Sequence, residues 1–222
     1  MIDFEIPADV AARRDQIRAF VTEKIVPFER DPRLTRHGPN EDLRTEMVEL
    51  ARDAGLLTFQ AQRRFGGWEP SHRDQAVLFE AAGWSTLGPV ALNCAAPDEA
   101  NMYILSKIAN TEQIEKFLVP VIEGRQRSVF AMTEPGGAGS DPDQLLTEAV
   151  FDGNEYVING RKWLITGANG ARTWIIMARL APNDHNAGGP TLFLCDGQTP
   201  GIKLERVMDT MDRNYVEGHG VV

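Results

Sequence analysis

The chain has 222 residues, of which 42% are hydrophobic and 25% are charged. This length fits one large domain or two small ones, and the composition is that of a folded globular protein rather than a disordered chain. The 32 acidic residues outnumber the 23 basic residues, which gives a net charge of −9. That balance argues against a general nucleic-acid-binding protein, because such proteins need cations that meet the phosphates.

The few cysteines and histidines argue against two further classes of protein. Cys94 and Cys195 are the two cysteines of the sequence, and they lie far apart on apolar stretches. A disulfide framework needs more cysteines, and the four histidines do not have the spacing of metal ligands. We therefore expect reduced thiols and no metal site.

The sequence shows neither a secretory signal nor a membrane helix. Met1–Glu5 lacks the basic and apolar regions of a secretory signal, and no apolar run approaches the ~20 residues of a membrane helix. We expect a cytoplasmic protein without a membrane span.

Gly218–Val222 has neither a charged tail nor a turn signal, which is more typical of a cut inside a longer protein than of a natural end.

The spacing of apolar residues predicts helices in the first half of the chain. Asn40 is expected to cap a helix that ends at Gly55, and Ser71 with Asp74 resembles a capping box. Pro120 is expected to disturb or end the last helix. The expected helices run over 9–30, from Asn40 to Gly55, from Ser71, from about Pro97, and from Thr111 to about Pro120.

After about residue 127 the sequence changes to short β-prone runs. Asp152-Gly153 and Asn159-Gly160 are dipeptides typical of tight hairpins, so an antiparallel sheet or small barrel is expected. Helices first and strands afterwards predict an α+β fold, with a helical domain over 1–127 and a β-domain over 128–222. The expected strands cover 128–133, 145–151, 155–158, 162–166, 173–179, 191–195 and 202–207.

A glycine-rich loop follows the first of these strands and is the most unusual stretch of the sequence. It reads Thr133-Glu134-Pro135-Gly136-Gly137-Ala138-Gly139-Ser140-Asp141. Glycines let a backbone approach a ligand closely, and consecutive N–H groups can point at an anion. The loop lacks the lysine of a P-loop and the third glycine of a dinucleotide fingerprint. Considered alone, it could equally be a plain wide turn.

A second segment favours a ligand-binding role for this loop over a plain wide turn. It reads Tyr156-Val157-Ile158-Asn159-Gly160-Arg161-Lys162-Trp163-Leu164-Ile165-Thr166-Gly167. The two segments together, at this separation, strongly resemble the acyl-CoA dehydrogenase family. Asn93–Asp98 with Asn101-Met102 is similar to the branch that contains the human family members ten and eleven. The resemblance covers nearly the whole chain.

The resemblance implies a flavoprotein that binds FAD on its β-domain. It implies that Thr133 lies near the isoalloxazine ring, that Thr166 offers a hydrogen bond near the reactive nitrogen, and that Ser140 contacts the substrate. Such donors matter because arriving hydride makes the flavin electron-rich. The implied cofactor-binding residues are Phe130, Ala131, Met132, Thr133, Ala138, Gly139, Ser140, Leu164, Ile165 and Thr166.

Two departures from the family pattern concern the same site. Leu164 stands where the family usually has a large aromatic residue, and Trp163 beside it would face the other side of a strand. The family's catalytic base is a glutamate in a C-terminal helical domain that this sequence lacks, so no catalytic residue is expected among the 222. Glu134 is expected to have a structural hydrogen-bonding role instead.

The implied reaction is α,β-dehydrogenation of an acyl-CoA, as in β-oxidation. The resemblance further implies an electron-transfer flavoprotein as electron acceptor, and a homodimer or homotetramer for the full-length enzyme. Two alternatives stay open. One is an acyl-CoA oxidase or flavin monooxygenase of the same fold, and the other is a non-catalytic subunit that binds FAD or CoA.

Overall fold

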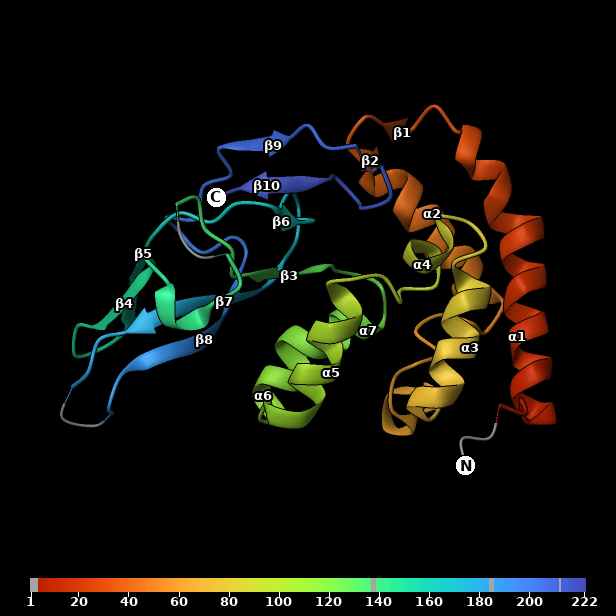
Figure 1. The fold of residues 1–222 in the computed structure, drawn as a ribbon, viewed down its shortest axis with the longest axis horizontal. Helices are drawn as coiled ribbons and strands as arrows, with labels where there is room; N and C mark the ends of the chain where they lie inside the picture. Colours follow the sequence, from red (N-terminus) through yellow and green to blue (C-terminus); the bar gives the residue numbers. More distant parts are fainter. Residues whose placement is uncertain (1–3, 137–138, 184–185, 212) are drawn as a thin grey trace.

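The chain folds into a helical part followed by a β-rich part, as the computed structural model shows for residues 4–136, 139–183, 186–211 and 213–222 (Figure 1). This arrangement confirms the predicted α+β fold. None of the helices in these ranges is long and apolar enough to cross a membrane. The α-helices are α1 (Ala8–Phe20), α2 (Glu41–Asp53), α3 (His72–Ala82), α4 (Gly88–Ala91), α5 (Asp98–Ile108), α6 (Thr111–Gln113) and α7 (Val119–Ile122).

The predicted helix caps are confirmed. The Asn40 side chain accepts a hydrogen bond from the Leu43 N–H at 2.9 Å, and Gly55 has a φ of +68° just after the second helix. The Ser71 hydroxyl accepts from the Asp74 N–H at 3.2 Å. These caps satisfy backbone groups that a helix end would otherwise leave without partners.

Two prolines interrupt the first and the last of the predicted helices. The first helix is regular only to Phe20 and continues as a π-helical turn, Val21–Ile25, and a 3₁₀ turn, Val26–Arg30, that contains Pro27. A second π-helical turn, Ile114–Leu118, precedes the short helix with Pro120. Proline has no N–H to donate and its ring crowds the preceding turn, so the hydrogen-bonding pattern changes there.

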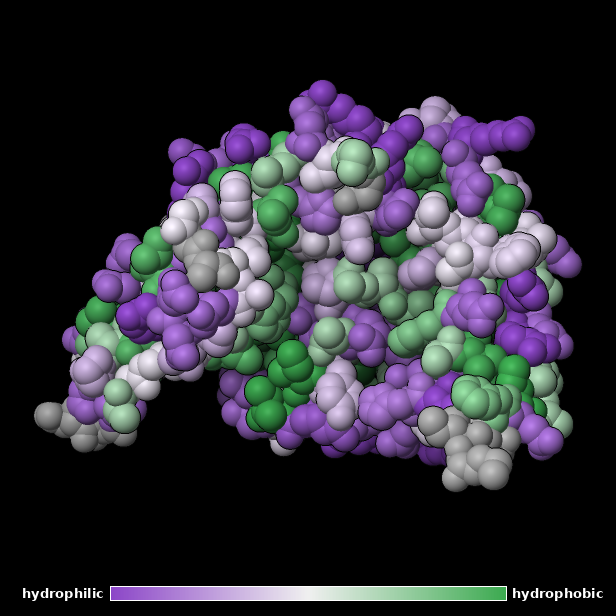
Figure 2. All heavy atoms as spheres, viewed as in Figure 1, coloured by the Kyte–Doolittle hydropathy of each residue, from purple (hydrophilic) through white to green (hydrophobic). Residues whose placement is uncertain are grey.

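The helices α1 to α4 share one apolar core, whereas α5 and α7 pack in a second cluster together with β7. Ile17 and Val21 from the first helix and its π-helical turn are fully buried, as are Leu43 and Met47 from α2. Figure 2 shows hydrophilic residues over much of the outer surface, with apolar residues around the hollow where the β-rich part faces α5 and α6.

The β-rich part contains a mixed sheet, whereas the sequence predicted antiparallel pairing. β3 and β4 both run parallel to β7, while β8 pairs with β7 and β5 with β4 in antiparallel fashion. Parallel pairs need long crossover connections, which hairpin dipeptides cannot indicate. The strands of this sheet are β3 (Ser128–Ala131), β4 (Glu148–Phe151), β5 (Tyr156–Asn159), β7 (Thr173–Leu180) and β8 (Gly189–Asp196).

A smaller sheet lies across the end of the helical part (Figure 1). It has the order β6-β10-β9 and is antiparallel throughout. Its strands are β6 (Ile165–Thr166), β9 (Arg206–Met208) and β10 (His219–Val221), and a separate hairpin joins β1 (Leu34–Thr35) to β2 (Gly38–Pro39).

One of the two predicted hairpins is present and the other is wrong. The Asp152-Gly153 turn joins β4 to β5, and Gly153 has a φ of +105°. Asn159-Gly160 makes no hairpin, because β5 pairs with β4 while the following strand pairs with β10. Gly160 instead allows close packing, since a Cβ there would lie 2.2 Å from Thr147 Oγ1.

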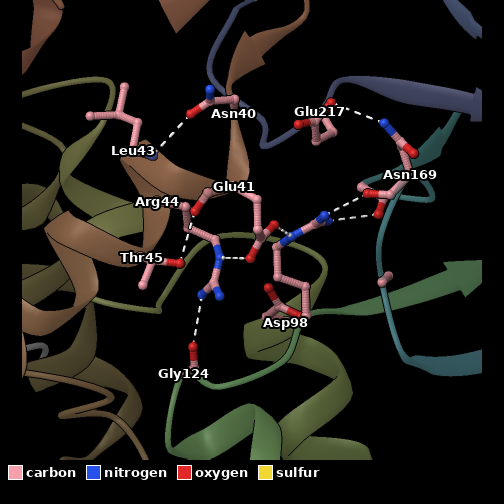
Figure 3. A network of polar contacts seen from close by, with 12 residues as sticks. Asn40, Glu41, Leu43, Arg44, Thr45, Asp98, Gly124, Asn169 and Glu217 are labelled. Atoms are coloured by element: carbon pink, nitrogen blue, oxygen red, sulfur yellow. Dashed lines mark hydrogen bonds and ion pairs between the residues drawn. The ribbon is translucent and has the colours of Figure 1, made fainter. Parts of the chain in front are cut away.

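A buried arginine connects the helical part to the β-rich part, and two of the residues that it contacts, Glu41 and Asn169, are labelled in Figure 3. Arg127 is 5% exposed and donates to Glu41 Oε2 on α2 at 2.8 Å. It also donates to the carbonyl oxygens of Gly167 at 2.7 Å and Asn169 at 2.5 Å, in the turn after β6. Burial alone would raise the pKa of Glu41, but Arg127 and Arg44 outweigh it and lower that pKa. The planar guanidinium thus holds three acceptors from both parts.

We predict that Arg127→Lys lowers the free energy of unfolding by about 2–3 kcal/mol, because an ammonium cannot reach all three acceptors and leaves buried groups without partners. Arg125→Lys is the matched control: Arg125 is 56% exposed and pairs with Glu123 at the surface. The control should change stability by under about 1 kcal/mol. Urea unfolding of both variants tests the prediction, and equal losses would contradict it.

Candidate functional site

The two segments singled out in the sequence lie side by side. The Trp163 N–H donates to the Thr133 carbonyl at 3.0 Å. The Thr133 hydroxyl donates to the Trp163 carbonyl at 2.6 Å. The end of β3 and the chain before β6 are therefore joined by two hydrogen bonds between the same pair of residues.

A buried ion pair holds these segments together. Lys162 Nζ lies 2.7 Å from Glu134 Oε1, and the two side chains are only 6% and 3% exposed. Lys162 also donates to the Met132 carbonyl at 2.8 Å. Glu134 accepts from the N–H groups of Leu146 at 2.6 Å and Thr147 at 2.9 Å. We call Glu134 and Lys162 with these backbone partners the clamp.

The clamp explains the titration behaviour of its carboxylate. Burial alone would raise the pKa of Glu134, but the hydrogen bonds from Lys162, Thr147 and Leu146 outweigh it and lower the pKa to about 2. A carboxylate held so firmly in its charged form is a poor acceptor of a substrate proton. The structural hydrogen-bonding role expected for Glu134 therefore agrees with its surroundings.

Leu164 has a conformation that the sequence did not indicate. Its φ is +56°, in the left-handed region, and its side chain is 44% exposed. β6 begins only at Ile165, so the expected strand alternation between Trp163 and Leu164 does not apply. A leucine in this region is strained, and such strain is concentrated at functional sites.

The site residues expected from the sequence differ in how deeply the structure buries them. Ala131 and Ile165 are each 1% exposed and pack in the core of the β-rich part, so their side chains do not face the surface. Phe130 is half-buried and packs against the cluster of α5 and α7. The other described residues also reach the surface at least partly: Met132, Thr133, Gly139, Ser140, Leu164 and Thr166. Ala138 lies outside the described residues.

The glycine-rich loop has an open side. Gly136 and Gly139 have φ values of +80° and +69°, and no atom lies within 4 Å of a Cβ built on either. Asp141 at the end of the loop accepts from the Asp143 N–H at 3.0 Å and so caps the 3₁₀ turn Pro142–Gln144. The backbone here can approach a ligand without obstruction from the described residues.

One residue at the site escaped the sequence analysis. His219 Nδ1 lies 2.9 Å from Thr166 Oγ1, although the two residues are far apart in the sequence. His219 stands opposite Thr166 in the pairing of β10 with β6. The sequence offered no spacing that would link them, and its one hint was the pair of glycines around His219.

A small cavity of about 30 Å³ lies beside Thr166, between the helical and β-rich parts. Asp98 lines it, and the N–H and hydroxyl of Ser128 donate to Asp98 Oδ1 at 2.5 and 2.6 Å. Burial raises the pKa of Asp98, and the Ser128 bonds oppose that rise. Among the residues that the structure describes, no group of histidines, cysteines and carboxylates could hold a metal ion.

Comparison with known proteins identifies both parts of the chain. Residues 8–125 match the N-terminal domain of acyl-CoA dehydrogenases, and residues 129–218 match the middle domain. The probable acyl-CoA dehydrogenase FadE2 of Mycobacterium tuberculosis is 35% identical over 98% of this chain and 55% of its own length. Mouse acyl-CoA dehydrogenase family member 10 is 31% identical over 94% of this chain and 21% of its own length, which confirms the predicted branch.

A solved structure supports the same relationship. An acyl-CoA dehydrogenase homologue from Mycobacterium abscessus superposes with a TM-score of 0.86 at 34% identity. The match covers 98% of this chain and 57% of that protein. The chain therefore spans about half the length of these bacterial relatives.

We predict that Glu134→Gln lowers the free energy of unfolding by about 3 kcal/mol, because it leaves the buried Lys162 ammonium without its counter-ion. Glu205→Gln is the matched control. The Glu205 side chain is 39% exposed and pairs with Arg161, the residue that precedes Lys162. Breaking that surface pair should cost under about 1 kcal/mol. Chemical denaturation at neutral pH compares the two variants, and a control loss as large as that of Glu134→Gln would refute the clamp.

The clamp also predicts a pH dependence. A carboxylate with a lowered pKa in the folded state stabilises the protein above its unfolded pKa of about 4.3, and this contribution is lost as the pH falls. For Glu134 the loss should be complete near its folded pKa of about 2. The stability difference between wild type and Glu134→Gln should therefore shrink from pH 5 towards pH 2. A constant difference over that range would contradict the assignment.

Proposed function

The chain belongs to the acyl-CoA dehydrogenase family, and we propose that it supplies the helical domain (1–127) and the flavin-facing β-domain (128–222) of an enzyme that dehydrogenates an acyl-CoA thioester. The observation that carries the proposal is the clamp. It brings Thr133, Leu164 and Thr166 from two distant segments to one region of the β-domain.

The residues in this region fit the isoalloxazine ring of FAD. A flat aromatic ring with polar edges needs an apolar contact and hydrogen-bonding groups around it. Leu164 offers an exposed apolar side chain, and Thr166 offers a hydroxyl group two residues further along. The Thr133 hydroxyl already donates to the Trp163 carbonyl, so it can only accept from a ligand. When bound, FAD would supply the hydride acceptor for the reaction.

Each side chain has a separate task in this proposal. Leu164 covers one face of the ring and excludes water from it, in place of the larger aromatic residue of other family members. Thr166 donates a hydrogen bond at the ring edge, where negative charge develops. Ser140 is exposed on the glycine-rich loop, which suits contact with the acyl-CoA.

The proton at the substrate α-carbon needs a base from outside these 222 residues. Glu134 lies in the glycine-rich loop itself, but three donors occupy it and its pKa is lowered to about 2. A chain that spans about half of its bacterial relatives agrees with a base carried elsewhere. Transfer of electrons to an electron-transfer flavoprotein, a dimeric or tetrameric assembly, and a cytoplasmic location complete the proposal.

The same lack of a base favours one alternative, a non-catalytic subunit that binds FAD. The two functions differ in what acyl-CoA does to a bound flavin. If a further segment or partner supplied a base, acyl-CoA would bleach the absorption bands of the bound flavin. In a non-catalytic subunit, the flavin bands would persist whatever was added.

We predict that the 222-residue chain binds added FAD and that its visible bands persist when an acyl-CoA is added without oxygen. Absorption and flavin fluorescence measure both steps. Absence of FAD binding would overturn the cofactor proposal, and bleaching would reveal a base within the chain.

Leu164→Asn should raise the FAD dissociation constant by about tenfold through loss of the apolar contact, which corresponds to about 1.4 kcal/mol. Asparagine tolerates the left-handed region, so the variant should fold at least as well as the wild type. Leu192→Asn is the matched control, because Leu192 is 37% exposed on β8 in the other sheet. An equal effect of both variants would refute the role of Leu164.

A further inference from the structure

His219 is placed against Thr166 by the backbone. The two residues face each other in the β6–β10 pairing, with Thr166 Oγ1 and His219 Nδ1 2.9 Å apart. The Gly167 N–H donates to the Gly218 carbonyl at 2.8 Å and so sets the register of the two strands. Gly220 lets the strand approach closely, since a Cβ there would lie 2.7 Å from Ala168 Cβ.

Further contacts hold both sides of this pair. On the Thr166 side, Arg127 donates to the carbonyl of the next residue, Gly167, at 2.7 Å. On the His219 side, the Tyr215 ring meets the imidazole edge to face, with 5.2 Å between the ring centres. This aromatic contact holds the plane of the imidazole, and in the structure Nδ1 lies beside the hydroxyl.

The chemistry of a hydroxyl then restricts how this hydrogen bond is shared. Threonine has one O–H donor and two lone pairs, and a neutral imidazole has one N–H and one acceptor nitrogen. If Thr166 donated to His219, it would have no proton left for another acceptor. Thr166 can donate to a ligand only when His219 carries its proton on Nδ1 and donates to the hydroxyl.

We propose that His219 is a positioning residue that donates from Nδ1–H to Thr166 Oγ1 and thereby directs the Thr166 proton outward to the flavin. This inference rests on the proposed function, because it needs Thr166 to face the cofactor. His219 itself does not touch the reacting atoms. It determines whether the Thr166 hydroxyl acts towards the flavin as donor or as acceptor.

The first test determines which ring nitrogen of His219 carries the proton, and it needs no cofactor. Two-bond ¹H–¹⁵N correlation spectra of the labelled 222-residue chain, recorded at an alkaline pH that keeps imidazoles neutral, distinguish the two tautomers. The sequence has four histidines, so the signals missing from His219→Phe identify His219. We expect the proton on Nδ1, and a proton on Nε2 would overturn the proposal.

The second test measures FAD affinity in a double-mutant cycle. His219→Phe keeps the ring shape and removes the hydrogen bond, and Thr166→Val keeps the shape of Thr166 without its hydroxyl. Each should raise the FAD dissociation constant about three- to tenfold. The double variant should bind FAD no more weakly than Thr166→Val alone. Additive losses, or an unchanged affinity in His219→Phe, would overturn the proposal.

Two controls separate positioning from a general structural effect. His219→Asn can still donate near the Nδ1 position, so it should recover most of the affinity that His219→Phe loses. His72→Phe makes the same exchange at an exposed residue of α3 and should bind FAD as the wild type does. If the wild-type chain bound no FAD, the proposed function would fail and the inference with it. If FAD bound but the cycle showed no coupling, the inference alone would fail.

Discussion

The buried ion pair between Glu134 and Lys162 is the interaction on which the candidate site depends. Removing two charges from water is costly, and a buried pair is tolerated only where its remaining hydrogen-bonding capacity is filled. The backbone groups of Met132, Leu146 and Thr147 supply most of these further partners. The pair therefore joins three stretches of chain in one arrangement, and a register shift in any of them would leave a charge without a partner.

The second constraint lies at the junction of the two parts of the chain. Arg127 connects α2 to the turn that follows Thr166, so the helical part helps to position a residue of the β-rich part. His219 approaches the same threonine from the neighbouring strand. Thr166 is thus held through its backbone neighbour on one side and through its hydroxyl on the other. Such support is what a group needs if it is to present a dipole in a fixed direction.

Leu164 connects strain with the proposed function. Without a ligand, Leu164 is unfavourable in two respects: its φ of +56° strains the backbone, and its exposed side chain leaves apolar surface in water. The clamp on Lys162 and the pairing of β6 hold it in this conformation from both sides. A flat ligand that covered the leucine would remove the exposed apolar area, which is the physical link between this strained residue and cofactor binding.

The sequence by itself determined the features that depend on neighbouring residues. It predicted the caps at Asn40 and Ser71, the hairpin at Gly153, the α+β order and the two motifs, because spacing and local hydrogen bonds decide these. Only the tertiary structure decided the parallel pairing on β7, the packing role of Gly160, the burial of Ile165, the left-handed Leu164 and the contact of His219 with Thr166. Each of these depends on a partner far away in the chain, and no local pattern of residues encodes which distant strand will lie alongside.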